Sequence, residues 1–145
     1  MSKVEDFLTA KEEEEIIKAI QLAEKDTSGE IRVHIERSTE KDPLERAKEV
    51  FCFLKMDETE KHNGVLFYLA VDDKKFSIIG DSGINKVVPE DFWDSIKEIV
   101  LGKFKKGKYS EGLKLGIMKT GDKLKQYFPY QNNDKNELED SISLN

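Results

Sequence analysis

The segment 65–71, VLFYLAV, constrains the fold more than any other part of this sequence. Its residues are nearly all apolar, so neither face of the segment suits water. A short run of this kind is typical of a strand that is buried on both faces of its sheet. We therefore predict a central strand at 65–71, in a sheet with helices on both faces.

Two more strands are expected on either side of this segment in the sequence. The segment 30–37, EIRVHIER, has the two-residue period of a strand with one strongly apolar face. Its apolar positions are Ile31, Val33 and Ile35, and its polar positions are Arg32, His34 and Glu36. The segment 72–75, DDKK, is a turn that leads into a returning strand at 76–79, so 65–79 is a hairpin.

Four amphipathic helices are predicted from apolar residues that recur every three or four positions. The first spans 10–25, and the TAKE sequence at 9–12 has the spacing of a capping box. The second follows the Asp-Pro pair at 42–43, with Asp as cap and Pro as first residue. The third opens at 89–91, and Ser110 caps the fourth. The polar segment between the second helix and the central strand is a loop.

The order of elements is therefore α-β-α-β-β-α-α. A right-handed crossover makes the first two strands parallel, and the third strand pairs antiparallel with the second. The predicted fold class is α/β, a three-layer α/β/α sandwich with a small mixed sheet. The 145 residues suit one domain, at 5–130, followed by a polar tail at 131–145. The apolar anchors of the tail are Leu138, Ile142 and Leu144.

Charge and composition restrict the partners. The formal net charge of -6 argues against nucleic acid. The segment 103–125 nevertheless carries eight lysines against Glu111 and Asp122, as a solvated helix face or a docking surface for a protein. No apolar run approaches the roughly 20 residues that span a bilayer, and Cys52 is the only cysteine. We expect a monomer in the cytoplasm, without membrane contact.

The stretch 80–83, GDSG, spells the nucleophile motif of trypsin-like proteases. A serine nucleophile needs a general base, and the only histidines are His34, in a predicted strand, and His62, in a predicted loop. Nothing in the sequence places either histidine beside Ser82, and the protease motif belongs to larger all-β enzymes. We interpret 80–83 as a turn that is structural or faces a cation.

The stretch 102–109, GKFKKGKY, nearly matches the phosphate-binding loop G-x-x-x-x-G-K-[ST]. Tyr109 stands where that loop needs a magnesium-binding Ser or Thr, and the stretch follows a helix rather than a strand. We expect instead a helix C-terminus, with Gly107 as its stop and lysines beside the negative end of the helix dipole.

Acidic residues gather at one edge of the predicted sheet. The starts of the first two strands and the end of the third meet there, at Glu30, 63–64 and 80–81. Glu90 and Asp91 open the next helix nearby. A hard divalent cation prefers several carboxylate and carbonyl oxygens, which this edge would offer.

The opposite edge offers a second acidic cluster, Asp72 and Asp73 with Ser38 and Asp42. Acidic residues are also common in hairpin turns and at helix caps, where they bind backbone amides and no metal. The spacing alone therefore leaves three readings open: a cation site at either edge, or no cation site.

Four stretches, taken in their order and spacing, resemble the TPM domain family. They are SGEIRV at 28–33, NGVL at 63–66, GDSGI at 80–84 and FKKGKYSEGL at 104–113. The resemblance covers about residues 5–128, and the family includes a thylakoid-lumen protein of photosystem II repair and phosphatase-like bacterial proteins. Two features depart from the family: an extra residue in the glycine loop at 80–83, and Lys108 where the family usually has an acid.

The resemblance implies an α/β/α sandwich that binds calcium or magnesium in acidic loops. Carried over position by position, it points to Glu30 and Asp81 as metal ligands, with Asp72 and Asp73 as the alternative cluster. We therefore expect a divalent-cation-binding protein, whose protein partner would dock on 103–125 or on the tail.

Two alternative functions stay open. The resemblance also implies a metal-dependent phosphomonoesterase, because acid phosphatase activity has been attributed to the plant member; the cation would polarise the phosphoryl oxygens. The other alternative is an adaptor without a ligand. No catalytic residue is predicted, because the sequence contains no recognisable pair of nucleophile and base.

Overall fold

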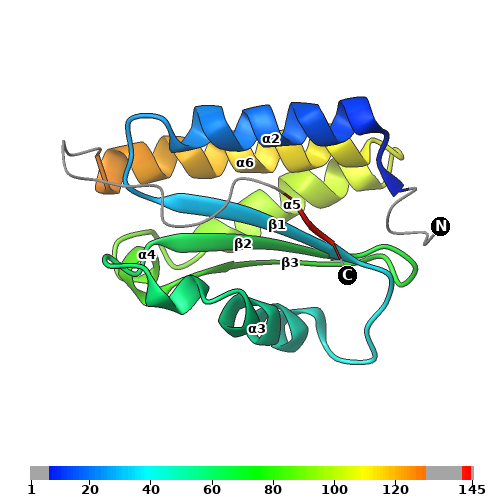
Figure 1. Cartoon of the computed structure of the whole chain (residues 1–145), viewed down its shortest axis with the longest axis horizontal. Coiled ribbons are helices and arrows are strands. Elements are labelled where there is room, and N and C mark those ends of the chain that lie inside the picture. Colours follow the sequence, from blue (N-terminus) through cyan, green and yellow to red (C-terminus); the bar gives the residue numbers. More distant parts are fainter. Residues whose placement is uncertain (1–6, 130–141, 145) are drawn as a thin grey trace.

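The computed structural model describes residues 7–129 and 142–144 and consists of a mixed sheet between two layers of helices (Figure 1). The elements are α2 (Ala10–Glu24), β1 (Glu30–Glu36), α3 (Pro43–Phe53), the 3-10 helix η1 (Met56–Glu58), β2 (Gly64–Ala70), β3 (Lys75–Gly80), α4 (Ser82–Asn85), α5 (Phe92–Phe104), α6 (Tyr109–Tyr127) and β4 (Ser143–Leu144). Helices α2, α5 and α6 lie on one face of the sheet, and α3 covers the other. The predicted α/β/α sandwich is confirmed.

The sheet has the strand order β3-β2-β1-β4. Strands β1 and β2 are parallel, with Glu30 opposite Gly64, and β3 returns antiparallel to β2, with Gly80 opposite Val65. Both pairings agree with the predicted topology. The short β4 was not predicted; it lies parallel to β1, with Ser143 opposite His34. Leu138, a predicted anchor of the tail, lies outside the described residues.

Two cores lie on the two faces of the sheet. The larger core is apolar and joins the sheet to α2, α5 and α6; it includes Ile31, Val33 and Ile35, the predicted apolar face of β1. The smaller core joins the sheet to α3, with Leu66 and Tyr68 of β2 on the sheet side. Every residue of β2 is buried, as the apolar run predicted. Two residues of the polar face of β1 are buried as well: Glu36 contacts Arg46 of α3, and His34 contacts Ser143 of β4.

The helix starts follow the predicted caps, with one exception. Thr9 and Glu12 form the capping box of α2, and the Asp42 side chain caps α3. The predicted cap at Ser110 is wrong, because α6 begins one residue earlier, at Tyr109, and Ser110 hydrogen-bonds the Glu12 carboxylate.

Two short helices were expected as irregular chain. Helix η1 lies in the segment predicted as a loop, and α4 follows the predicted turn at 80–83. The predicted stop after α5 is confirmed, since Gly107 has a left-handed φ of 74°. None of the helices within 7–129 combines the length and the apolar character needed to cross a membrane.

Helices α2 and α6 approach closely where Gly121 faces Ala23. A Cβ at Gly121 would lie 2.7 Å from Ala23 Cα and 2.9 Å from its carbonyl oxygen, both backbone atoms that cannot turn aside. We predict that Gly121→Ala lowers the free energy of unfolding by about 1–3 kcal/mol, because the two helices must separate. Urea denaturation followed by circular dichroism measures this.

The matched control is Gly102→Ala, at a helical glycine of α5 with no atom within 4 Å of the added Cβ. Alanine is the better helix former, so this variant should gain roughly 0.5–1 kcal/mol. Equal effects of the two substitutions would contradict the close approach of α2 and α6.

Candidate functional site

The predicted acidic edge exists, and it lies where β1 and β2 begin and β3 ends. The Glu30 amide donates to the Asn63 carbonyl at 3.3 Å, and the Asp81 amide donates to the Gly64 carbonyl at 3.0 Å. Glu30 and Asn63 are each 2% exposed. The strand pairing therefore brings together the three positions that the sequence placed at this edge: Glu30, 63–64 and 80–81.

Asp81 uses one carboxylate oxygen and leaves the other without a hydrogen bond. Its Oδ1 accepts from the Ser82 amide at 2.7 Å and so caps α4. Its Oδ2 is buried and accepts no hydrogen bond, although the Nδ1 of His62 lies 3.4 Å away. A buried carboxylate oxygen without a hydrogen bond is unfavourable by about 1–3 kcal/mol or more unless another group or ion compensates it.

The segments that carry Asp81 and His62 are in close backbone contact at Gly83. The Gly83 amide donates to the His62 carbonyl at 2.8 Å. A Cβ at Gly83 would overlap the carbonyl oxygens of Lys61 and His62, so no other residue fits there without moving the loop. The second glycine of GDSG thus holds two loops at van der Waals contact.

None of the described histidine contacts involves Ser82, although His62 lies at the same edge. The described partners of His34 are Ser143 and Glu36, and the described partner of His62 is Asp81. Ser82 itself is exposed in the first turn of α4. That 80–83 is a turn rather than a protease motif stays a prediction.

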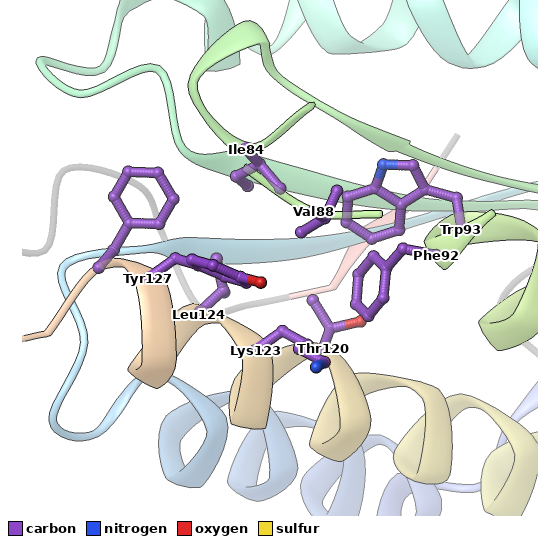
Figure 2. Close-up of a pocket in the computed structure, with 9 residues that line it drawn as sticks. Ile84, Val88, Phe92, Trp93, Thr120, Lys123, Leu124 and Tyr127 are labelled. Carbon is purple, nitrogen blue, oxygen red and sulfur yellow. The ribbon is translucent and has the colours of Figure 1, made fainter. Parts of the chain in front are cut away.

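A small cavity lies next to this edge, behind α4. Figure 2 shows it between Ile84 and Val88 on one side, Trp93 on another, and Leu124 of α6. Its volume is about 10 Å³, which holds one water molecule at most. It is therefore too small for a phosphate ester.

The opposite edge carries Asp72 and Asp73, and the protein itself binds both carboxylates. Asp72 Oδ2 accepts from Arg37 Nε at 2.9 Å, and Asp73 Oδ2 accepts from the Thr39 amide at 2.8 Å. The Asp42 side chain caps α3 by accepting a hydrogen bond from the Leu44 amide. These acids fasten the hairpin turn to the loop between β1 and α3, and a cation there would compete with these bonds.

Within 7–129 and 142–144, no three His, Cys, Asp or Glu side chains are grouped in a way that could hold a metal ion. A cation at the Glu30–Asp81 edge would consequently need amide, backbone or water oxygens to complete its shell. Calcium, which takes roughly six to eight oxygen ligands of mixed kinds, tolerates such a shell.

A buried charge cluster under α3 was not predicted. Glu36, at the end of β1, accepts from Arg46 Nε at 2.8 Å and from Arg46 Nη2 at 2.9 Å. Its carboxylate also accepts from the Tyr68 hydroxyl, and His34 Nε2 lies 3.2 Å from Oε1. The other ring nitrogen of His34 lies 3.0 Å from Ser143 Oγ on β4. The cluster links four elements: β1, β2, α3 and β4.

The cluster shifts the pKa values of its members. Burial raises the pKa of Glu36, but hydrogen bonds from Arg46, Tyr68 and His34 outweigh burial and hold it at about 2. Burial lowers the pKa of His34 despite the neighbouring Glu36. Burial and Glu36 together raise the pKa of Tyr68. At neutral pH the cluster is therefore an ionised carboxylate and guanidinium, a neutral imidazole and a neutral phenol.

These groups satisfy one another, so we interpret the cluster as structural. Each oxygen of Glu36 and each ring nitrogen of His34 has a partner inside the protein. The polar alternation of 30–37 was the signal in the sequence that could have found it, because a helix was expected over that face.

Comparison with known proteins places the chain in a family. The family model for the TPM domain matches residues 1–123, most of the chain. This chain belongs to the TPM domain family. A search of curated proteins gives no match.

Three solved structures share the fold of this chain. The NMR structure of the BA42 protein from the psychrophilic bacterium Bizionia argentinensis is 52% identical over 100% of both chains, with a TM-score of 0.91. The N-terminal domain of a protein from P. gingivalis is 16% identical, with a TM-score of 0.70 over 86% of this chain and 83% of that one. The N-terminal domain of the cg2496 protein from Corynebacterium glutamicum is 13% identical, with a TM-score of 0.65 over 81% and 74%.

The Glu36 cluster makes the stability of this TPM domain depend on pH. The folded-state pKa of Glu36 is depressed from 4.5 to about 2, so its contribution is complete above 4.5 and is lost as the pH falls toward 2. We predict that Glu36→Gln lowers the free energy of unfolding at pH 7 by on the order of 3 kcal/mol, and that this difference shrinks between pH 4.5 and 2. Urea denaturation across this range measures it.

Glu49→Gln is the control, because Glu49 is the exposed partner of Arg46. It should change stability little at any pH. A Glu36→Gln effect that stays constant from pH 7 to 2 would mean that Glu36 is not an ionised member of the cluster.

Proposed function

We propose that this TPM domain binds a divalent cation, calcium or magnesium, at the edge formed by Glu30, Asn63 and Asp81. The observation that carries the proposal is Asp81 Oδ2, a buried carboxylate oxygen that accepts no hydrogen bond. A cation bound there would contact this oxygen more closely than His62, whose Nδ1 lies 3.4 Å away.

The neighbouring groups suit a hard cation. Glu30 provides a second carboxylate with almost no exposure to solvent, and Asn63 provides an amide oxygen at the same edge. Two carboxylates would neutralise the two charges of calcium or magnesium, and water would complete the shell. The Asp72–Asp73 cluster is less suitable, because Arg37 and the Thr39 amide already bind these carboxylates.

A binding role is better supported than hydrolysis. A phosphomonoesterase needs a nucleophile with a base that activates it, and none of the described histidine contacts pairs a histidine with Ser82. The cation would then act on the loops: it would fasten α4 and the His62 loop to the starts of β1 and β2.

The substitution Asp81→Asn tests the proposal while it preserves the fold. Asparagine caps helices about as well as aspartate, so α4 should stay capped, but the charge for the cation is lost. We predict that calcium stabilises the wild-type domain by about 2.7 kcal/mol at a concentration 100 times its dissociation constant. Asp81→Asn and Glu30→Gln should each lose most of this gain, as measured by thermal unfolding with and without calcium.

Two control variants separate the readings. Asp94→Asn removes an exposed acid on α5 and should leave the calcium effect unchanged. The double variant Asp72→Asn/Asp73→Asn should also keep it. If the Asp72→Asn/Asp73→Asn variant lost the calcium effect and Asp81→Asn kept it, the cation site would lie at the opposite edge of the sheet. No calcium effect on the wild type would favour an adaptor without a ligand.

A further inference from the structure

A second, much larger cavity opens at the other end of β2. Its volume is about 450 Å³, within the roughly 300–1,000 Å³ typical of small-molecule sites. It lies where β2 ends, α5 ends and α6 begins, at the right of Figure 1, while α4 and the Glu30–Asp81 edge lie at the left. The two sites are therefore at opposite ends of the sheet.

The walls of this cavity are apolar and aromatic side chains, all of them partly exposed except the buried Leu69. They are Phe7, Leu69, Val71, Leu101, Phe104 and Tyr109. Three aromatic rings of the wall pack against one another. The ring centroids of Phe7 and Tyr109 are 5.0 Å apart, and those of Phe104 and Tyr109 are also 5.0 Å apart. The aromatic wall is thus formed before a ligand arrives, and it suits an apolar chain or ring.

Two lysines line the cavity, Lys74 in the hairpin turn and Lys105 at the end of α5. Lysines elsewhere on this part of the chain are paired, as Lys103 is with Glu111 and Lys114 with Glu15. The described ion pairs include neither Lys74 nor Lys105. Both side chains belong to exposed residues, so their ammonium groups can reach the mouth.

Nearby acids cancel only part of this positive charge. Asp72 is paired with Arg37, whereas Asp73 accepts from the neutral Thr39 amide and keeps its own charge next to Lys74. The N-terminus of α6 and the C-terminus of α5 both lie in the cavity wall, so their dipoles oppose each other, and the net positive charge comes from Lys74 and Lys105. The cavity therefore combines an apolar interior with a cationic mouth.

We propose that this cavity binds a medium-chain fatty acid, with its alkyl chain against the aromatic wall and its carboxylate between Lys74 and Lys105. Charge complementarity selects the carboxylate, since Lys74 and Lys105 both line the cavity and neither takes part in a described ion pair. The apolar lining selects an alkyl chain over a polar metabolite, because it offers no buried hydrogen-bonding side chain of its own. The site is independent of the cation at the Glu30–Asp81 edge.

Titration of the whole ¹⁵N-labelled protein with decanoate tests the proposal. We expect saturable amide shifts at Phe7, Leu101 and Tyr109. Octanoate, two methylenes shorter, should bind roughly tenfold or more weakly, at about fourfold per methylene. Decan-1-ol has the same chain without the charge and should also bind at least about tenfold more weakly.

A double variant tests the lysines without disturbing the core. Lys74→Gln/Lys105→Gln should raise the decanoate dissociation constant about tenfold. Lys86→Gln/Lys106→Gln removes the same charge from exposed positions outside the cavity and should change it less than about twofold. Both variants should keep the wild-type melting temperature.

Three results would overturn the proposal. The first is no saturable shift at the cavity residues. The second is equal binding of decanoate and decan-1-ol, which would mean an apolar cavity that does not select an anion. The third is binding to anionic phospholipid vesicles without binding of monomeric decanoate, which would assign the lysines to a membrane surface. Repeating the titration with and without calcium separates a failure here from a failure of the cation site.

Discussion

The parallel register of β1 and β2 determines where each functional element of this domain lies. It sets Glu30 opposite Gly64 at one end and Glu36 opposite Ala70 at the other. Since β3 returns antiparallel from the second end to the first, Asp81 arrives at the same edge as Glu30, with Gly64 of β2 between them. The same register places the hairpin turn, with Lys74, at the far end, next to the large cavity. A shift by one residue would turn Glu36 and His34 into the apolar core, so the pattern of β1 specifies the register strongly.

The two faces of the sheet are held by different physical forces. The face under α2, α5 and α6 is apolar, and close helix contacts at small residues such as Gly116 and Gly121 stabilise it. The face under α3 contains an ionised carboxylate that is 2% exposed. Burying such a charge away from water is unfavourable by several kcal/mol. The bidentate hydrogen bonds from Arg46 and the hydrogen bond from the Tyr68 hydroxyl compensate for this cost. The cluster therefore fixes the position of α3 more than it adds to stability. Through His34 it also joins β4 to the sheet.

The periodic patterns of apolar residues predicted the helices and strands of this fold, and therefore its layers. These patterns and the side-chain caps depend only on residues close together in the sequence. The strands and long helices appear within one to three residues of their expected bounds, and Thr9 and Asp42 cap as expected. The sequence did not reveal α4, because a helix of four residues is too short to show a periodic pattern of apolar residues. It did not reveal β4 either, because the pairing of β4 with β1 is a long-range contact. Topology correctly brought Glu30, Asn63 and Asp81 to one edge. The topology could not show that Arg37 and the Thr39 amide hydrogen-bond the carboxylates of Asp72 and Asp73, because each of these contacts joins loops that are about 35 residues apart in the chain. Nor did the sequence show the large cavity, whose lining comes from β2, α5, α6, the hairpin turn and the segment before α2.

The most direct test of the cation site is an amide NMR titration of metal-free protein, first with calcium and then with magnesium. The account predicts saturable shifts that cluster at Glu30, 62–64 and 80–83, where the two loops and the strand ends meet. Shifts centred on Asp72 and Asp73 would contradict this edge as the site, and the absence of any saturable shift up to millimolar cation would contradict cation binding itself.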